Sequence, residues 1–552
     1  MTKKVFSFVI FFSFLMFYNI SGQNFDRSIT ITKTYEPVFS TKEKIDEKPE
    51  IYDTTKIKPV FNYIILPIKV DASYSPNEIK PAKISAIPVD KVYSNFFKIG
   101  LGNYLSPELI YQFSSLRARD YSYGLNISHL SSTSKITLEN KHKINAGYYD
   151  NIIEAYGTKL IDFIKLDGNV FLKGNAINYY GYNTNLFIDS IPDINKQSIK
   201  QVYNEIGIKL SLEKQCSDLD KFGYSFRPFY SYFYDKYKNN QHSLSINGNL
   251  FVKLNNKLLD FKIFTNYNYY NTSFDTAKTW IVSFIPSITK KEEKYEYDAG
   301  FLLSLGSDDE LSKFYFAPKL RFMLRMAEDY FNPYIGIDGF IKSNTYKDLA
   351  IINPYIVPGF KSLLSEFLVF YGGIKGLLYS KWGYDLSTSY SYHNNMTLFV
   401  KDTIGKLQNQ FIVVNDNINK TELSLISYFY PTKNLKFELE GIYRYILLEK
   451  EKYAWHLPNY EIKSKFSLLI KSKIMTKLSF NYFDSRYSKI AGDTNYYKLP
   501  SIIDLNLNLE YYHSKILTFY FNIYNIASSK YQIWYQYPVQ RLNFIVGLTY
   551  KL

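Results

Sequence analysis

The segment DLNLNLEYY, residues 504–512, alternates polar and apolar side chains without a break. Asp504 and Asn506 are polar, and Leu505 and Leu507 stand between and after them. A period of two residues is typical of a β-strand that has one apolar face and one polar face. The fold therefore depends on what each of these two faces contacts.

The same period recurs along most of the chain. A strand in a soluble protein usually has about five or six residues. Many of the alternating runs here are longer, and their length suits a tilted membrane strand of about 9–11 residues. A soluble secreted β-protein would also alternate, so the period alone leaves that alternative open. Examples of the recurring segments are 244–252, 259–268, 435–444 and 517–524.

The connections between these segments alternate between short and long. Barrels of the outer membrane have short periplasmic turns and long extracellular loops. The apolar face is therefore expected to meet lipid, and the polar face a wet or protein-filled lumen. An open sheet edge in lipid would leave backbone groups unpaired at a cost of several kcal/mol each, so the sheet must close. The short connections are 254–257, 431–434 and 513–515, and the long ones are 183–198, 343–366, 448–458 and 527–540.

These patterns predict an all-β fold, a transmembrane antiparallel β-barrel over residues 93–552. We expect about 22 strands, with 20 to 24 allowed, because bacterial single-chain barrels have an even number. The hairpins at 131–151 and 400–421 can be divided in more than one way. A barrel of this width would leak if it were empty, so we expect something to fill the lumen.

The composition fits a membrane protein that lies at an interface. Of 552 residues 18% are aromatic, with 55 Tyr and 43 Phe. Tyrosine combines an apolar ring with a hydrated hydroxyl and suits the boundary between hydrocarbon and water, although nucleotide-composition bias explains part of its abundance. The formal charge of +15 would favour nucleic acid in a soluble protein. In an exported chain it favours outer-membrane lipid and lipopolysaccharide, and we expect no nucleic-acid partner.

Residues 1–22 read as a secretory signal peptide. Lys3 and Lys4 form a basic start, residues 5–18 are almost entirely apolar, and cleavage is expected after Gly22. A retained membrane helix is the alternative, but the apolar run is short for a span. Export without transmembrane helices predicts a location in the cell outer membrane. The single cysteine, Cys216, excludes an internal disulfide.

The last loop and last strand carry Tyr537-Pro538, Arg541 and the segment Gly547-Leu548-Thr549-Tyr550. They resemble the closing hairpin of TonB-dependent receptors, especially those of Bacteroidota. The chain departs from that pattern where Pro-Gly-Arg is usual, and it ends on Leu552 rather than on an aromatic residue. The resemblance covers about thirty residues and implies a barrel that takes part in substrate uptake across the outer membrane.

Receptors of this family carry an N-terminal plug of well over a hundred residues. Here only residues 23–92 separate the signal peptide from the first strand, so we expect no globular plug. The segment is expected to be extended because proline removes a backbone donor, and to lie in the periplasm or partly occlude the lumen. Its prolines are Pro37, Pro49, Pro59, Pro67, Pro76, Pro81 and Pro88.

Near its start, this segment is similar to a TonB box. Such a box is a short extended stretch that adds as a strand to the edge of an energising periplasmic protein. The resemblance implies that a TonB-like or other periplasmic protein binds here, whereas an ordinary strand or tether is the alternative. The residues concerned are Ile29, Thr30, Ile31 and Thr32.

No catalytic, cofactor-binding or metal-binding set is evident, and we do not expect an enzyme. The six histidines form no His-x-x-x-His motif and no Cys/His cluster, and no Gly-x-Ser-x-Gly occurs. A surface hydrolase is the least favoured function. Its candidate residues are His129 beside Ser128 and Ser131, or His393 near Asp385.

Charged residues elsewhere have simple interpretations. The run Asp308-Asp309-Glu310 suits calcium but is more often just hydrated. Inward-facing charges are expected to pair across the wall. These charges are Asp260, Lys262, Glu438, Glu440 and Arg444.

Two functions remain after these exclusions. The first is substrate uptake, with loop 343–366 as an outer gate, because Asn353-Pro354-Tyr355 and Pro358-Gly359 favour a folded lid over a floppy linker. The alternative is a membrane-embedded scaffold subunit of an envelope assembly or secretion complex. The sequence does not identify a substrate.

Overall fold

The computed structural model describes residues 93–552 apart from short stretches. These stretches are 117–119, 188–193, 195, 215–220, 273–275, 309–311, 327–329 and 360–362. The signal peptide 1–22, the segment 23–92, the TonB-box-like residues Ile29 to Thr32 and Cys216 all lie outside the described residues.

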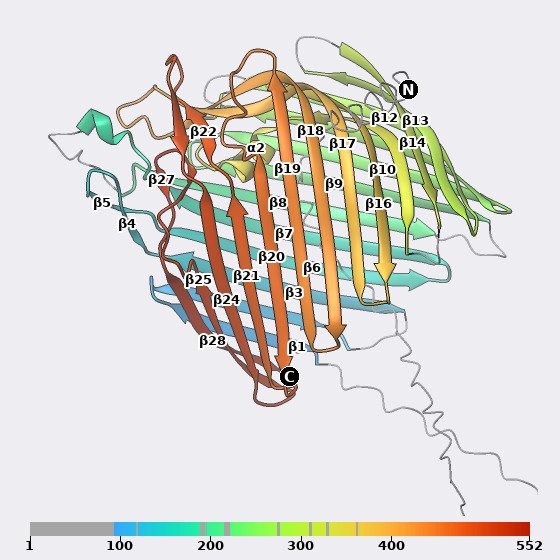
Figure 1. Ribbon diagram of the computed structural model, residues 1–552, viewed down its shortest axis with the longest axis horizontal. Helices are drawn as coiled ribbons and strands as arrows, with labels where there is room; N and C mark the ends of the chain where they lie inside the picture. Colours follow the sequence, from blue (N-terminus) through green and yellow to red (C-terminus); the bar gives the residue numbers. More distant parts are fainter. Residues whose placement is uncertain are drawn as a thin grey trace, which may run out of the picture. The chain divides into compact units, whose positions relative to one another are not determined.

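Of the described strands, 22 form one antiparallel sheet that closes on itself, and the others form three two-stranded sheets (Figure 1). Closure comes from β1, which pairs with β28 from Phe96–Lys551 to Gly102–Ile545. The prediction of an all-β barrel with 22 strands is therefore confirmed. The strands of the barrel are β1 (Asn95–Gly102), β2 (Ser106–Ser114), β3 (Tyr121–Ser132), β6 (Tyr148–Ile161), β7 (Ile164–Asn178), β8 (Lys200–Lys214), β9 (Phe222–Asp235), β10 (Asn240–Leu254), β11 (Lys257–Asn271), β12 (Thr276–Lys291), β13 (Tyr295–Ser307), β14 (Ser312–Leu324), β15 (Asn332–Ser343), β16 (Leu364–Leu378), β17 (Trp382–Lys401), β18 (Phe411–Thr432), β19 (Leu435–Leu448), β20 (Tyr460–Ile470), β21 (Ile474–Phe483), β24 (Ile502–Tyr512), β25 (Leu517–Tyr524) and β28 (Asn543–Lys551).

Strand β24 shows what the two faces of the opening segment contact. Ile503 and Tyr511 are exposed on the outside of the barrel. Asp504 faces inward, where it accepts hydrogen bonds from Asn481 (3.3 Å) and Asn506 (2.7 Å). The apolar face therefore forms the outer wall, and the polar face lines the lumen.

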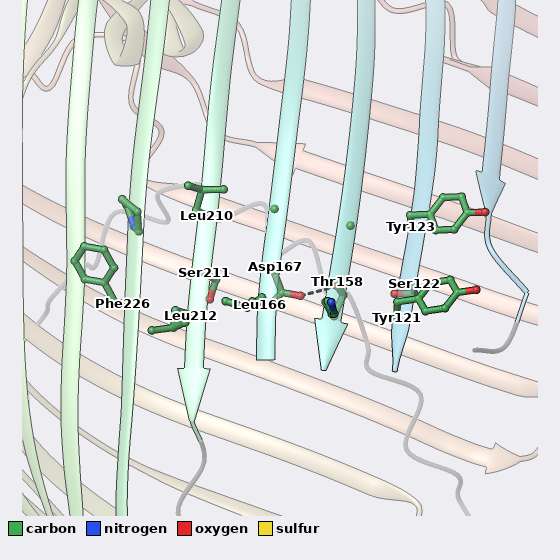
Figure 2. A pocket seen from close by; sticks show the side chains of 14 residues that line it. Tyr121, Ser122, Tyr123, Thr158, Leu166, Asp167, Leu210, Ser211, Leu212 and Phe226 are labelled. Carbon is green, nitrogen blue, oxygen red and sulfur yellow. Dashed lines mark hydrogen bonds between the residues drawn. The ribbon is translucent and has the colours of Figure 1, made fainter. Parts of the chain in front are cut away.

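The outer wall is apolar over other strands too. Tyr121, Tyr123, Leu210 and Phe226 are exposed on β3, β8 and β9. Together with neighbouring residues they surround a shallow hollow of about 670 Å³ (Figure 2). Because two tyrosines lie at the start of β3, aromatic rings gather at this end of the wall, as they do at the interfaces of membrane barrels.

The two ends of the barrel differ in their connections. One end, the short-turn end, has tight connections such as 255–256, 433–434 and 471–473. The other, the long-loop end, carries the loops that contain the remaining helices and strands of the described residues. These loops are 133–147 with β4 (Lys135–Thr137) and β5 (Lys143–Asn145), 179–199 with η1 (Thr184–Phe187), 344–363 with α2 (Tyr346–Ile352), 402–410, 449–459, 484–501 with β22 (Arg486–Lys489) and β23 (Tyr496–Leu499), and 525–542 with β26 (Gln532–Trp534) and β27 (Tyr537–Pro538).

The two ambiguous hairpins are now assigned. Residues 131–151 contain the small β4–β5 sheet between β3 and β6. Residues 400–421 contain a single loop between β17 and β18, and both strands extend well beyond a usual membrane strand.

Helix α2 is short and capped. Thr345 is its N-cap, and the Thr345 side chain accepts a hydrogen bond from the backbone N–H of Asp348 at 3.2 Å. Tyr346, Leu349 and Ala350 form its buried face. Among the described residues, no helix has the length and apolar character needed to cross a membrane.

Candidate functional site

Loops of the long-loop end fold inward and fill the mouth of the barrel. Their aromatic and aliphatic side chains pack against inward-facing residues of β8, β9, β11, β17 and β18 and form the largest buried cluster. We call it the mouth cluster. Its members are Ile136, Leu138, Ile144, Ala146, Tyr179, Tyr180, Tyr182, Ile199, Tyr203, Phe233, Tyr270, Tyr346, Leu349, Ala350, Ile356, Phe399, Phe411 and Tyr537, with Tyr355 and Trp534 packed against them.

Three tyrosines from three different loops form the centre of the mouth cluster. The rings of Tyr355 and Tyr537 stack with their centroids 3.7 Å apart, and Tyr180 packs edge-on against Tyr537 at 4.9 Å. The Tyr180 hydroxyl donates to the carbonyl oxygen of Pro538 at 2.8 Å. Burial raises the pKa of all three hydroxyls above the usual range, so they remain neutral hydrogen-bond donors.

Lys401 connects the wall to two of these loops. It ends β17, is only 1% exposed, and donates from Nζ to the carbonyl oxygens of Gly181 (2.6 Å) and Tyr535 (3.4 Å). The amino group also lies 5.3 Å from the ring centroid of Tyr537. Burial lowers the pKa of the Lys401 amino group well below its usual value, and a buried amino group is costly unless acceptors surround it, so these contacts specify one arrangement of the loops.

Asp235 holds helix α2 against the wall. One carboxylate oxygen accepts hydrogen bonds from the Tyr346 hydroxyl (2.8 Å) and the Gln201 amide (3.0 Å). The other accepts from the backbone N–H groups of Tyr237 (2.8 Å) and Asn239 (2.9 Å). A carboxylate satisfied by this many donors fixes the position of loop 344–363.

A second contact of α2 lies one residue further on. Lys347 Nζ forms an ion pair with Glu205 at 3.0 Å and donates to Ser231 Oγ at 3.2 Å. Its backbone N–H donates to the Gln241 side chain at 3.0 Å. The described part of loop 344–363 is therefore folded, as the prolines predicted, and polar contacts with β8, β9 and β10 hold it in place.

A polar cavity of about 410 Å³ lies beside the mouth cluster. We call it the Asp504 pocket. Burial, followed by the effect of Asp504, raises the pKa of Tyr531 to about 12, so this hydroxyl stays protonated. The buried amide oxygens Asn178 Oδ1 and Asn543 Oδ1 accept no hydrogen bond from the described residues. The lining residues are Ile136, Ala146, Gly147, Tyr148, Ile177, Asn178, Tyr180, Tyr355, Asp504, Asn506, Tyr524, Asn525, Tyr531, Val539, Gln540, Arg541 and Asn543.

The chemistry of the Asp504 pocket suits a polar solute. Two buried amide oxygens in its wall lack donors, and tyrosine hydroxyls and amides line it together with Asp504, Arg541 and aliphatic side chains. The pocket shares Tyr180 and Tyr355 with the mouth cluster. Movement of the central tyrosines would therefore change the pocket directly.

The histidines weighed for a hydrolase do not form catalytic sets. His129 contacts Asn151 at 2.6 Å and Ser131 at 3.0 Å, and neither is a carboxylate. His393 contacts Ser391 at 2.5 Å. Asp385 does not orient His393, because Nδ1 of His393 has no hydrogen-bond partner among the described residues, and the Asp385 carboxylate accepts the Tyr334 hydroxyl of β15 at 2.6 Å.

Asp308 makes two contacts with neighbouring residues. It accepts the backbone N–H of Leu364 at 3.3 Å and forms an ion pair with Lys313 at 3.5 Å. Asp309 and Glu310 lie outside the described residues. Within the described part of the chain, no group of three or more His, Cys, Asp or Glu residues is placed to hold a metal.

The expectation that inward-facing charges pair across the wall holds for part of the set. Arg444 on β19 pairs with Glu422 on β18 at 2.9 Å and with Glu461 on β20. Glu440 pairs with Lys463 of the next strand at 3.5 Å.

The other charges pair within one strand. Asp260 and Lys262 form an ion pair at 2.9 Å on β11, and Glu438 pairs with Lys436 on β19. Residues two apart share a face of a strand, so the sequence was as compatible with pairs within one strand as with pairs between strands.

Lys401 and Asp235 were not singled out from the sequence. Each stands at the end of an alternating run, where a charge reads as the start of a hydrated loop. Their partners, such as Gly181 and Tyr346, are remote in the chain. No local signal identifies these contacts.

Comparison with known proteins gives likeness in structure alone. No protein-family model matches the chain, and no curated protein matches it in sequence. The ferric-catecholate import receptor Fiu from E. coli K12 in its closed form has a TM-score of 0.63 at 9% identity, covering 83% of this chain and 82% of that one.

Two further solved structures are similar to the same extent. The FrpB iron transporter from Neisseria meningitidis (F5-1 variant) has a TM-score of 0.66 at 9% identity, over 84% of this chain and 83% of that one. The siderophore receptor PirA from Acinetobacter baumannii has a TM-score of 0.63 at 12% identity, over 83% and 80%. At these identities the shared property is the 22-stranded receptor-like barrel.

Proposed function

We propose that this chain is an uptake receptor of the outer membrane whose outer gate is the mouth cluster. The long-loop end then faces the cell exterior, and the short-turn end faces the periplasm. The short turns at one end and the long loops at the other support this orientation, and the apolar outer wall and the likeness to import receptors support a place in the outer membrane. The observation that carries the proposal is that inward-folded loops occupy the mouth of a barrel that would otherwise be a wide pore.

In this proposal the gate works by displacement of the central tyrosines. A solute arriving from outside separates the Tyr355–Tyr537 stack and reaches the Asp504 pocket, where Asn178 and Asn543 offer free acceptors. The contacts of Asp235 and Lys401 keep the loops closed when no solute is bound. The substrates named for the similar receptors are not carried over, because the likeness is one of fold.

The energy source is a second part of the proposal. Residues 23–92, and within them Ile29 to Thr32, would bind a TonB-like protein or another periplasmic protein after cleavage near Gly22. Lipopolysaccharide and lipid would surround the wall. Deletion of residues 24–90 should abolish recovery of a periplasmic partner, and unchanged recovery would reject this part.

The gate is tested by conductance in planar bilayers. Replacing Tyr355 and Tyr537 by alanine should raise single-channel conductance several-fold, because it removes the stack at the centre of the mouth. The matched control replaces Tyr121 and Tyr123, an aromatic pair on the outer wall whose centroids are 6.2 Å apart, and should leave conductance unchanged. Equal conductance in all three proteins would reject the gate.

Purification in mild detergent separates uptake from the scaffold alternative. An uptake receptor should be recovered with no fixed companion other than the periplasmic partner of residues 23–92, and its deletion should impair growth on a particular nutrient. Stable envelope proteins recovered in fixed ratio with the full-length chain would favour the scaffold.

A further inference from the structure

Strands β14 and β15 are neighbours in the barrel but pair over a very short length. Their ladder runs only from Leu320–Ile337 to Met323–Tyr334. It is shorter than the closing ladder between β1 and β28 and the other short ladders of the described barrel. We call this junction the β14–β15 seam.

Each of the two strands is fully paired on its other side. β14 pairs with β13 along its whole length, from Tyr295–Leu324 to Ser307–Ser312, and β15 pairs with β16 from Asn332–Lys375 to Ser343–Leu364. The missing pairs therefore belong to the seam and do not arise from frayed strands. Pro318 lies in the unpaired part of β14, and proline is usual at strand edges because it has no N–H to donate.

Residues 338–343 of β15, at the long-loop end, leave the wall and cross the inner face of the neighbouring strands. We call this half of each strand its upper part. Ser343 Oγ lies 2.7 Å from Thr279 Oγ1 on β12, although β13 and β14 separate these strands in the sheet. Gly339 permits this path, because a Cβ at that position would lie 2.3 Å from the Cβ of Ala317. Upper β14, residues 312–319, therefore has an edge without a strand beside it.

Side chains close the seam in place of backbone hydrogen bonds. Lys319 and Asp338 form an ion pair at 2.7 Å across it, and the Tyr315 hydroxyl donates to the carbonyl oxygen of Phe367 at 2.5 Å. Behind them lies a small apolar cluster. Its members are Ile281, Ile341 and Leu364, with Tyr315 packed against them.

The two sides of the seam differ in chemistry. On the outside, Phe314 is 66% exposed and Phe316 is 55% exposed. On the inside, a cavity of about 260 Å³ lies behind the apolar cluster, and Ile281 and Ile341 belong to both. The polar residues that line this cavity are Ser243, Ser245, Asn266, Asn268, Lys342, Ser343, Thr345, Lys347 and Asp348.

We propose that the barrel opens laterally at the β14–β15 seam and admits an amphipathic lipid from the outer leaflet. The acyl chain lies along Phe314 and Phe316, and the polar head enters the cavity lined by Asn268, Ser343 and Asp348. A lipid fits because it is apolar where the edge is apolar and polar where the cavity is polar. Unpaired edges in hydrocarbon are costly, so an opening is expected at the seam that already lacks its ladder.

Photo-crosslinking in reconstituted bilayers tests this proposal on the full-length protein. The single cysteine, Cys216, is first replaced by serine, and Lys319→Cys and Asp338→Cys are then introduced. The probe is a phosphatidylethanolamine that carries a diazirine on its head group. In the reduced protein we expect adducts on inward-facing Asn268 and Ser343, and their loss when oxidation joins the two cysteines.

The matched control joins β14 to its other neighbour. Asp298 and Arg321 are opposite each other in the full β13–β14 ladder. Oxidation of Asp298→Cys with Arg321→Cys should leave the adducts on Asn268 and Ser343 unchanged. The proposal would be overturned if the reduced protein formed no adducts on Asn268 and Ser343. It would also be overturned if the adducts were equally abundant after oxidation had joined the cysteines at positions 319 and 338.

Hydrogen exchange on the unmodified protein provides a second measurement that needs no cysteine. Within residues 312–319, the alternate amides that point away from β13 should exchange faster than the amides that donate to β13. Equal protection would show that the edge of β14 is covered and would reject a lateral opening. Neither result bears on conductance through the mouth cluster, so the uptake proposal is tested separately.

Discussion

The two ends of this barrel are specified in different ways. At the short-turn end, compact turns contain residues with left-handed backbone, such as Asp162 (φ 52°) and Asn255 (φ 50°), and each turn joins strands adjacent in sequence. At the long-loop end, Lys401 contacts Gly181 and Asp235 contacts Tyr346 across long stretches of chain. Local sequence therefore determines the turns, whereas a few remote polar contacts determine the closed mouth.

If this contrast is correct, the largest single effect should follow the loss of Asp235. Asp235→Ala removes the acceptor for Tyr346, Gln201 and two backbone donors in a buried site. We expect the free energy of local opening of α2 to fall by about 3 kcal/mol, because hydrogen bonds to a charged group are lost and their donors stay buried. Hydrogen exchange of the α2 amides measures this change.

Asp260→Ala is the control for that variant. Asp260 is also buried and forms an ion pair with Lys262 at 2.9 Å, but it lies on the wall away from α2. The α2 amides should exchange at the original rate in this variant. If the α2 amides lost protection from hydrogen exchange to a similar extent in both variants, the whole barrel, and not loop 344–363 alone, would have been destabilised.

Lys401 provides a somewhat smaller test. Lys401→Met keeps the length of the side chain but leaves the carbonyl oxygens of Gly181 and Tyr535 without this donor. We expect a loss of about 2 kcal/mol in the stability of loops 179–199 and 525–542, seen as faster limited proteolysis of both.

Lys420→Met is the matched comparison. Lys420 is also only 1% exposed, but its Nζ has no hydrogen-bond partner among the described residues. Removal of a buried amino group that makes no hydrogen bond is expected to be neutral or stabilising. Should Lys420→Met accelerate proteolysis as much as Lys401→Met, the contacts of Lys401 would not be what holds the loops.

The sequence predicted the barrel well because its signal is repeated. The alternation in β24, with Leu505 and Leu507 on one face, recurs in strand after strand, so errors at single boundaries do not alter the closed sheet or its 22 strands. The folded state of the loop at Tyr355 was also predicted, because prolines there favour a folded loop. The resemblance at Tyr537-Pro538 indicated a receptor barrel, and Tyr537 proved to lie at the centre of the mouth cluster.

The contacts inside the mouth could not be predicted in the same way. Nothing near Lys401 in the chain indicates that Gly181 will face its amino group, because that proximity exists only after the barrel closes. The β14–β15 seam is similar: alternation continues through both strands, and only the path of Ser343 toward Thr279 shows that they separate. Periodicity specifies the face of a residue but not its remote partner.

His456 extends the contrast to pH. It lies in loop 449–459, where burial, and then the charges of Arg486 and Lys401, lower its pKa to about 3 from 6.5. The rings of Trp534 and Phe411 pack on it, at 4.8 Å and 5.5 Å.

The unfolded loop binds a proton below pH 6.5, whereas the folded loop does not until about pH 3. The folded loop is therefore most stable above pH 6.5, where His456 is neutral in both states. This stability is lost as pH falls toward 3, and the equilibrium constant for local opening rises by at most about tenfold per pH unit. Proteolysis of loops 449–459 and 525–542 at a series of pH values measures this dependence. His456→Gln should remove it, and an unchanged dependence in that variant would assign it to another group.

The smallest effect is expected at the short-turn end. Asn255 adopts φ 50° in the connection between β10 and β11, a conformation that asparagine tolerates better than alanine does. Asn255→Ala should cost about 1 kcal/mol, measured as a lower urea midpoint for unfolding in detergent micelles, and Asn255→Gly should cost nothing. Neither variant should change conductance or the exchange of α2, because the turn makes only local contacts. If Asn255→Ala opened the mouth, the two ends would be coupled through the wall, and the separation of local and remote determinants would fail.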